Sequence, residues 1–148
     1  MHPFGEILSN NILWATLFSC VLAQILKIPF HYLIHKELNW TRCIGSGGMP
    51  SSHSSSVCTL ATCVGLQYGF GTPLFAVATA FAFIVMYDAA GVRKATGEQA
   101  KILNRIIKKF EKHEFQVDQE LKELIGHTKV EVLAGATMGI LLGILFSM

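Results

Sequence analysis

Residues 45 to 53 read Gly-Ser-Gly-Gly-Met-Pro-Ser-Ser-His, a run that has the chemistry of an anion site. Glycines leave backbone N–H groups open to close approach by an anion. Pro50 is suited to the first turn of a helix, which would put Ser51, Ser52 and His53 at a helix N-terminus. The N–H groups and the dipole of a helix N-terminus favour phosphate. The alternative is an ordinary Gly/Ser loop followed by a helix cap.

A second stretch pairs a histidine with a carboxylate. His127 and Glu131 are four residues apart, so they share one face of a helix. A carboxylate bonded to one ring nitrogen selects the tautomer and makes the other nitrogen a better nucleophile. The alternative is a surface pair that contributes little.

A third stretch, Asp88 to Lys94, carries Arg93 close to the expected end of an apolar segment. An arginine there can bind a phosphate through two parallel hydrogen bonds. It can equally be a basic anchor at the membrane surface. Lys27 and Arg42 add two more cations near apolar segments. Together the three stretches indicate a phosphate site far more specifically than any one alone.

The elements that must position these residues are apolar helices. Hydrophobic residues make up 51% of the 148 and charged residues 15%, whereas soluble domains carry about 25% charged residues. No Asp, Glu, Lys or Arg lies between Glu6 and Lys27, between Arg42 and Asp88, or after Glu131. A membrane span needs about 20 apolar residues. The uncharged stretches therefore predict one, two and one crossings, and they exclude a soluble domain.

The sequence thus predicts an all-α integral membrane bundle of about four transmembrane helices. The expected segments are 7–26, 54–68, 74–86 or slightly beyond, and 127 or 130–148. The second and third are separated by a short Gly/Pro break, which predicts an antiparallel hairpin. In the last segment, Gly135, Ala136, Gly139 and Gly143 allow close approach of another helix, although glycine is also common in membrane helices generally.

Residues 97–125 differ from the rest because apolar side chains recur there at three- and four-residue steps among Lys and Glu. This pattern indicates an amphipathic helix. We favour packing against the protein's own membrane-facing end over a helix lying on the lipid surface. The expected organisation is one membrane domain, 1–148, with a cytoplasmic amphipathic insertion at about 95–126. The four cysteines, Cys20, Cys43, Cys58 and Cys63, are expected to be free thiols.

The placement of basic residues predicts the orientation. All twelve Lys and Arg residues lie in 27–53 or 88–131. With four crossings, both regions lie on one side of the membrane. The positive-inside rule assigns that side to the cytoplasm or its organellar equivalent. We therefore expect a bacterial inner or plasma membrane, or an organelle membrane, with the site facing the cytoplasm and both termini across the membrane.

These residues resemble the type 2 phosphatidic acid phosphatase superfamily, which includes vanadium haloperoxidases, and more closely its small divergent membrane branch. Residues 50–53, Pro-Ser-Ser-His, match the family's Pro-Ser-Gly-His with Ser52 in place of glycine. His127 to Glu131 match the end of the third motif, with Glu131 in place of aspartate, and Arg93 matches its arginine. The chain departs from the family in having no Pro after Arg42, no Ser before Arg93 and about thirty residues between Arg93 and His127.

The resemblance implies a division of roles. His127 would attack phosphorus, Glu131 would orient it and His53 would protonate the leaving oxygen, with Asp88 in support. The phosphate oxygens would be bound by Lys27, Arg42, Gly47, Gly48, Ser51, Ser52 and Arg93. No cofactor or metal is implied. This division suits phosphoryl transfer, which depends on positioning and positive charge more than on covalent chemistry.

The leading hypothesis is therefore a membrane phosphatase that hydrolyses a lipid phosphate or diphosphate through a phosphohistidine. Its partners would be that phosphorylated lipid and membrane lipids, with a homo-oligomer expected from the glycine-rich face and no nucleic acid. A second hypothesis is a non-catalytic protein that binds a phosphorylated lipid or acts in assembly. A third is a small transporter, for which mid-membrane polar residues are weak candidates: Gln24, Thr59, Thr62 and Thr79.

Overall fold

The computed structural model describes residues 3–38, 40, 47–111 and 126–148, and its elements are all helical. The side chains of residues 3, 92–94 and 108–111 lie outside this description. The helices, in chain order, are α1 (Pro3–Leu8), α2 (Asn11–His35), α3 (Ser52–Tyr68), α4 (Pro73–Ala90), α5 (Val92–Glu111) and α6 (Lys129–Ser147).

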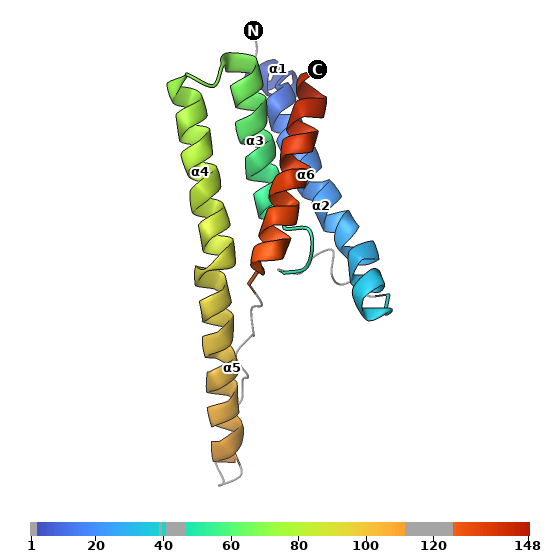
Figure 1. Ribbon diagram of the computed structural model, residues 1–148, viewed down its shortest axis with the longest axis vertical. Helices are drawn as coiled ribbons and strands as arrows, with labels where there is room; N and C mark the ends of the chain where they lie inside the picture. Colours follow the sequence, from blue (N-terminus) through green and yellow to red (C-terminus); the bar gives the residue numbers. More distant parts are fainter. Residues whose placement is uncertain (1–2, 39, 41–46, 112–125) are drawn as a thin grey trace.

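Helix α3 is the centre of the bundle. Ten of its 17 residues are buried, and it packs against α2, α4 and α6 (Figure 1). Its buried side chains are small: Ser, Thr, Cys, Ala and Val. Small side chains allow neighbouring helices to approach closely, and their hydroxyls bond across the interface. One such bond joins Ser55 to Ser19 of α2, at 2.6 Å between the two Oγ atoms.

The glycines of α6 form the face that packs on α3. Gly135, Gly139 and Gly143 are all buried, and a Cβ on any of them would collide with α3. Thr59 of α3 donates its hydroxyl proton to the carbonyls of Ser55 and Gly139, at 2.9 and 3.0 Å. The close approach predicted for the small residues of α6 is therefore confirmed, with α3 as the partner. The homo-oligomer was predicted from this glycine-rich face. Because α3 covers the face, the glycines give no support for contact with a second copy, and the homo-oligomer stays a prediction.

The outward faces of the other helices are apolar. Examples are Val21 and Ile25 on α2, Val77 and Ile84 on α4, and Leu141 on α6, each at least half exposed. Three described stretches are long and apolar enough to cross a membrane: Asn11–His35, Pro73–Ile107 and Lys129–Ser147. An all-helical bundle of membrane-spanning character is therefore confirmed. The fourth predicted crossing, α3, is shorter and richer in hydroxyl side chains than these three.

The first apolar segment differs from its predicted bounds. Asn10 caps α2 by accepting the N–H of Leu13 at 3.0 Å, so a separate α1 precedes the span. The helix then continues through Lys27 and Pro29, where the sequence predicted its end, to His35. Lys27 does not end the helix because its side chain turns inward and is only 2% exposed.

The two ends of the bundle are formed by different parts of the chain. The α3–α4 turn lies at the same end as the N- and C-termini, and the hairpin predicted for α3 and α4 is confirmed (Figure 1). Thr72 caps α4 by accepting the N–H of Phe75 at 3.3 Å. At the other end, the N-termini of α3 and α6 lie beside each other (Figure 1).

Helix α5 continues the direction of α4 away from the bundle (Figure 1). Its apolar side chains Ile102, Leu103 and Ile106 are exposed. The packing that we favoured for the amphipathic stripe is therefore not seen along α5, because the helix extends beyond the bundle instead of folding back on it. The remainder of the predicted stripe, 112–125, lies outside the described residues. Of the cysteines, Cys20, Cys58 and Cys63 are free thiols as expected, and Cys43 lies outside the described residues.

Candidate functional site

His127 and Glu131 are in contact at the start of α6. The Nδ1 atom of His127 lies 3.1 Å from Oε2 of Glu131, and His127 is only 4% exposed. An ionised carboxylate can only accept hydrogen bonds, so in the neutral ring the proton is assigned to Nδ1. Nε2 then carries the lone pair. The predicted contact is present, and in the neutral ring it selects the tautomer that a nucleophile requires. The predicted shared helix face is wrong, because His127 precedes the N-cap Thr128 and lies outside α6.

Glu131 is held by the helix that it belongs to. Its Oε2 also accepts the N–H of Thr128 at 3.0 Å, and the hydroxyl of Thr128 accepts the N–H of Glu131 at 3.3 Å. This reciprocal pair is a capping box. One carboxylate thus both caps α6 and orients His127. The Thr-Lys-Val-Glu spacing is a capping-box signature, so the role of Thr128 could have been found from the sequence, where our reasoning missed it.

Two backbone hydrogen bonds position this motif against the rest of the bundle. The N–H of His127 donates to the carbonyl of Ala89, at the end of α4, over 3.1 Å. The N–H of Ser51 donates to the carbonyl of Glu131 over 3.0 Å. Segments that are far apart in sequence are therefore joined within the first turn of α6.

The N-terminus of α3 forms the other half of the site. Ser51 is the N-cap, and its Oγ accepts the N–H of Ser54 at 3.3 Å. Pro50 therefore lies one residue before the cap, not in the first helical turn as predicted, because Ser51 takes the capping position. Ser52 and His53 follow as the first helical residues. Gly47 and Gly48 have φ of 92° and 86°, values that favour glycine.

Ser51 differs from its predicted role as a phosphate ligand. It is fully buried, its N–H is donated to Glu131 and its hydroxyl is used in capping. These bonds make Ser51 a residue that positions the two helix N-termini. The N–H groups of Ser52 and His53 lie in the first turn of α3, where helices leave backbone donors available.

The two histidines of the site face each other. The ring centroids of His53 and His127 are 6.5 Å apart, and the rings meet edge to face. His53 is exposed, whereas His127 is buried. The structure thus brings together two histidines that are more than seventy residues apart in the sequence.

A cation is buried beside this pair. The side chain of Lys27 packs along Gly48, with its Cδ 3.9 Å from the position of a Cβ there, and it lines a cavity of about 230 Å³ together with Glu131. His31 and His35 of α2 line the same cavity, and their rings stack with centroids 4.3 Å apart. Sequence reasoning gave these two histidines no role. Their spacing of four residues was the signal that could have placed them on one helix face.

The remaining predicted residues are placed as follows. Asp88 is half-buried on α4, next to Ala89, whose carbonyl accepts the N–H of His127. Arg93 belongs to the first turn of α5, and its side chain lies outside the description. Arg42 lies outside the described residues.

Six of the predicted site residues meet at one end of the bundle. They are Lys27, Gly48, Ser51, His53, His127 and Glu131.

The bundle and its site define an all-helical membrane protein with paired histidines at the joined N-termini of two helices. Residues 8–142 match the Divergent PAP2 family, so the chain belongs to that family, and the divergent branch predicted from the motifs is confirmed. The chain is 39% identical over 148 residues to the uncharacterized membrane protein YuiD of Bacillus subtilis (strain 168), covering 93% of this chain and 94% of that relative. No solved structure matches the chain.

Proposed function

We propose that this protein is a membrane phosphatase that hydrolyses a lipid phosphate or diphosphate through a phosphohistidine intermediate. The observation that carries the proposal is the pair His127 and His53, with Glu131 on Nδ1 of His127 and Lys27 buried beside them. Membership of a PAP2-related family supports this choice of chemistry. The placement of the pair at one end of a membrane bundle suits a substrate whose tail lies in lipid and whose phosphate lies at the surface.

The proposed reaction has two steps. Nε2 of His127 attacks phosphorus, the bond from phosphorus to the leaving oxygen breaks, and His53 gives that oxygen its proton. Water then attacks the phosphohistidine while His53 takes up the water proton. The bond from phosphorus to Nε2 breaks, and inorganic phosphate leaves. Glu131 stabilises the charge that develops on the His127 ring in the first step.

Positive charge and backbone donors supply most of the stabilisation. Lys27, Gly47 and Gly48 lie beside the first turn of α3, whose N–H groups and dipole favour an anion. Preorganised donors of this kind stabilise the charge spread over a transferring phosphoryl group. Arg42 and Arg93 are proposed to complete the phosphate site, with Asp88 in support, on the strength of the family motif.

We further propose that α3 is a fourth crossing. Its 17 residues span roughly 25 Å at 1.5 Å per residue, close to the hydrocarbon core of about 30 Å. Two of its hydroxyl side chains bond to neighbouring helices, Ser55 to Ser19 of α2 and Thr59 to the carbonyl of Gly139 on α6. Two exposed aromatic residues of α2, Trp14 and Tyr32, are separated by roughly 27 Å of helix, which suits aromatic belts at the two interfaces.

The deciding experiment traps the intermediate. Purified protein is incubated with a lipid phosphate labelled with ³²P, quenched and digested, and the labelled peptide is mapped. We expect label on His127 that is lost in acid and retained in base, and neither label nor turnover with His127→Ala. Gln67→Ala, which removes an exposed side chain at the far end of α3, is the control and should keep the label. Label on a serine, or turnover without His127, would contradict the assignment.

The same experiment separates the enzyme from a non-catalytic lipid-phosphate binder. A binder would retain affinity for phosphorylated lipid that depends on Lys27 but release no phosphate from any lipid phosphate or diphosphate. That outcome would replace the phosphatase proposal with the second hypothesis.

The proposed orientation places the site in the cytoplasm, because all basic residues lie at the site end or in the regions joined to it. An impermeant thiol reagent tests this in intact cells, in a background without native cysteines. Gly71→Cys, in the exposed turn at the opposite end, should be labelled from outside, and Lys101→Cys of α5 only after permeabilisation. The reverse pattern would overturn the orientation.

A further inference from the structure

An apolar groove of about 440 Å³ runs along the bundle between α3, α4 and α6. Its walls are almost entirely carbon, formed by side chains such as Ala61, Leu66, Phe75, Phe83 and Ile140. The volume lies within the range of about 300–1,000 Å³ that is typical of small-molecule pockets. None of the residues proposed for the phosphate chemistry lines it.

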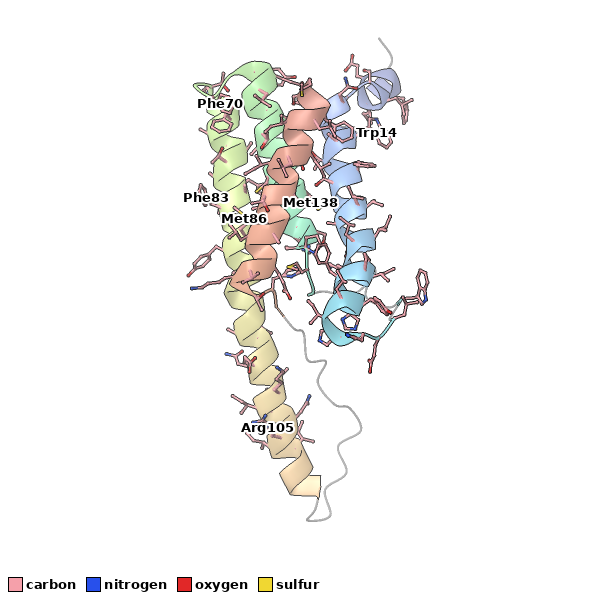
Figure 2. The ribbon with its side chains drawn as sticks, turned by 45° about the vertical axis from the view of Figure 1, so that its right-hand side comes forward. Trp14, Phe70, Phe83, Met86, Arg105 and Met138 are labelled. Carbon is pink, nitrogen blue, oxygen red and sulfur yellow. The ribbon has the colours of Figure 1, made fainter. Side chains whose placement is uncertain are left out.

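The groove exists because α4 and α6 each pack closely on α3 but only slightly on each other. The glycine face of α6 brings that helix against α3, which leaves the apolar flank of α6 opposite α4. Figure 2 labels two of the lining residues: Phe70 lies at the turn between α3 and α4, and Met86 lies near the other end of α4, so the groove follows most of α4. From Phe75 to Met86 is roughly 16 Å of helix, about the depth of one leaflet.

The end of the groove that Met86 and Ala136 line is the end nearer to the phosphate site. Met86 lies one helical turn before Ala89, whose carbonyl accepts the N–H of His127. On α6, Ala136 lines the groove and directly follows Gly135, which packs on Ser51. The end of the groove at Met86 and Ala136 thus lies within one helical turn of residues that position the two halves of the phosphate site.

We propose that this groove binds one hydrocarbon chain of the lipid whose phosphate is bound at His53 and His127. This inference rests on the proposed function for the identity of the lipid phosphate and adds the place in the fold where one long hydrocarbon chain of that lipid is bound. The chain is recognised by close packing of its methylenes against the carbon walls, because a bilayer is as apolar as the groove and transfer from lipid removes no surface from water. Thr79 has a buried hydroxyl, with no hydrogen-bond partner in the described residues, in the wall of this groove.

Filling the groove tests the proposal by kinetics. Thr79→Phe and, separately, Ala136→Leu place extra carbon in the groove, whereas Ala80→Phe places the same ring on the exposed side of α4. We expect the ratio of kcat/KM for a sixteen-carbon lipid phosphate to that for a six-carbon analogue to fall about 10-fold in both groove variants, since several methylenes lose their packing contacts with the groove. Ala80→Phe should leave the ratio unchanged. An unchanged ratio in both groove variants would overturn the proposal.

A photoreactive lipid phosphate with a diazirine in its chain gives a readout that does not need turnover. We expect labelling of α4 and α6 at Phe83 and Ile140, competition by the six-carbon phosphate through the shared head site, and loss of labelling with Thr79→Phe. Labelling without phosphate release would support the groove while the phosphatase proposal fails. Phosphate release with equal labelling of outward residues such as Leu141 would overturn the groove alone. Efficient crosslinking of Phe83→Cys between two copies would show that another subunit fills it, which also overturns the proposal.

Discussion

The Oε2 atom of Glu131 lies 3.1 Å from Nδ1 of His127 and also accepts the N–H of Thr128 at 3.0 Å. The orientation of the candidate nucleophile is thereby coupled to the first turn of α6. Glu131 stands where the family motif has aspartate, and the longer side chain spans the distance because it turns back over its own helix N-terminus. The same oxygen thus makes both contacts. The charge of Glu131 and the Thr128 half of the capping box can still be removed by separate substitutions.

Glu131→Gln should reduce turnover without unfolding the protein. Glutamine keeps a carbonyl oxygen that can accept from His127 and Thr128, but it removes the charge that stabilises the positively charged ring during attack. We expect turnover to fall by on the order of 10² to 10⁴, with full loss only in His127→Ala. The comparison is made with the purified protein at equal folded concentration, measured by the rate of phosphate release.

Thr128→Ala is the matched control for that substitution, because it removes half of the capping box and leaves the carboxylate. We expect a loss of about 1 kcal/mol in the free energy of unfolding and a change in turnover smaller than that of Glu131→Gln. If Thr128→Ala lowered turnover as much as Glu131→Gln, the role of Glu131 would be structural and the orientation argument would be wrong.

His53→Ala should slow the reaction in a way that depends on the leaving group. General acid catalysis typically contributes about 10² to 10⁴ in rate, and it matters least where the leaving oxygen needs no proton. We therefore expect a large loss with an alkyl phosphate and a small one with a nitrophenyl phosphate. Equal losses on both substrates would assign His53 to binding and not to proton transfer.

Lys27→Met should weaken the binding of phosphate because it removes a buried cation while keeping the length of the side chain. Loss of one preorganised group that stabilises the transferring phosphoryl charge commonly costs about 10² to 10³ in rate. The matched control is Lys36→Met, which removes an exposed lysine at the end of α2 and should change neither rate nor affinity. Competition by vanadate, measured as an inhibition constant, reports the affinity separately from the rate.

Gly139→Val should destabilise the bundle. The α6 backbone at this position packs directly on Ser55 and Cys58 of α3, so added carbon forces the two helices apart. Overpacking of a close interface costs about 1 to 3 kcal/mol. Thr137→Val, on the exposed face of the same helix, is the control and should be neutral. Thermal unfolding in detergent measures both, and equal melting temperatures would contradict the α3–α6 interface.

The sequence alone determined the helical class, most of the helix positions and the contact between His127 and Glu131. Apolar runs of spanning length are local properties, so they can be identified without the tertiary structure. The contact was predicted on the wrong basis, because it forms across the N-cap of α6 and not along a helix face. The same local reasoning failed at Lys27. A lysine followed by a proline normally ends an apolar helix, yet here α2 continues because the lysine is buried against Gly48.

Only the tertiary structure decided how the helix N-termini meet. The bond from Ser51 to Glu131 joins residues eighty positions apart, and it converts a predicted phosphate ligand into a positioning residue. The groove also arises from packing, because it is the space left where α4 and α6 both follow α3 without closing on each other. Contacts of this kind depend on which helix faces meet, and hydrophobic periodicity gives no information about partners when every helix is apolar on most of its surface.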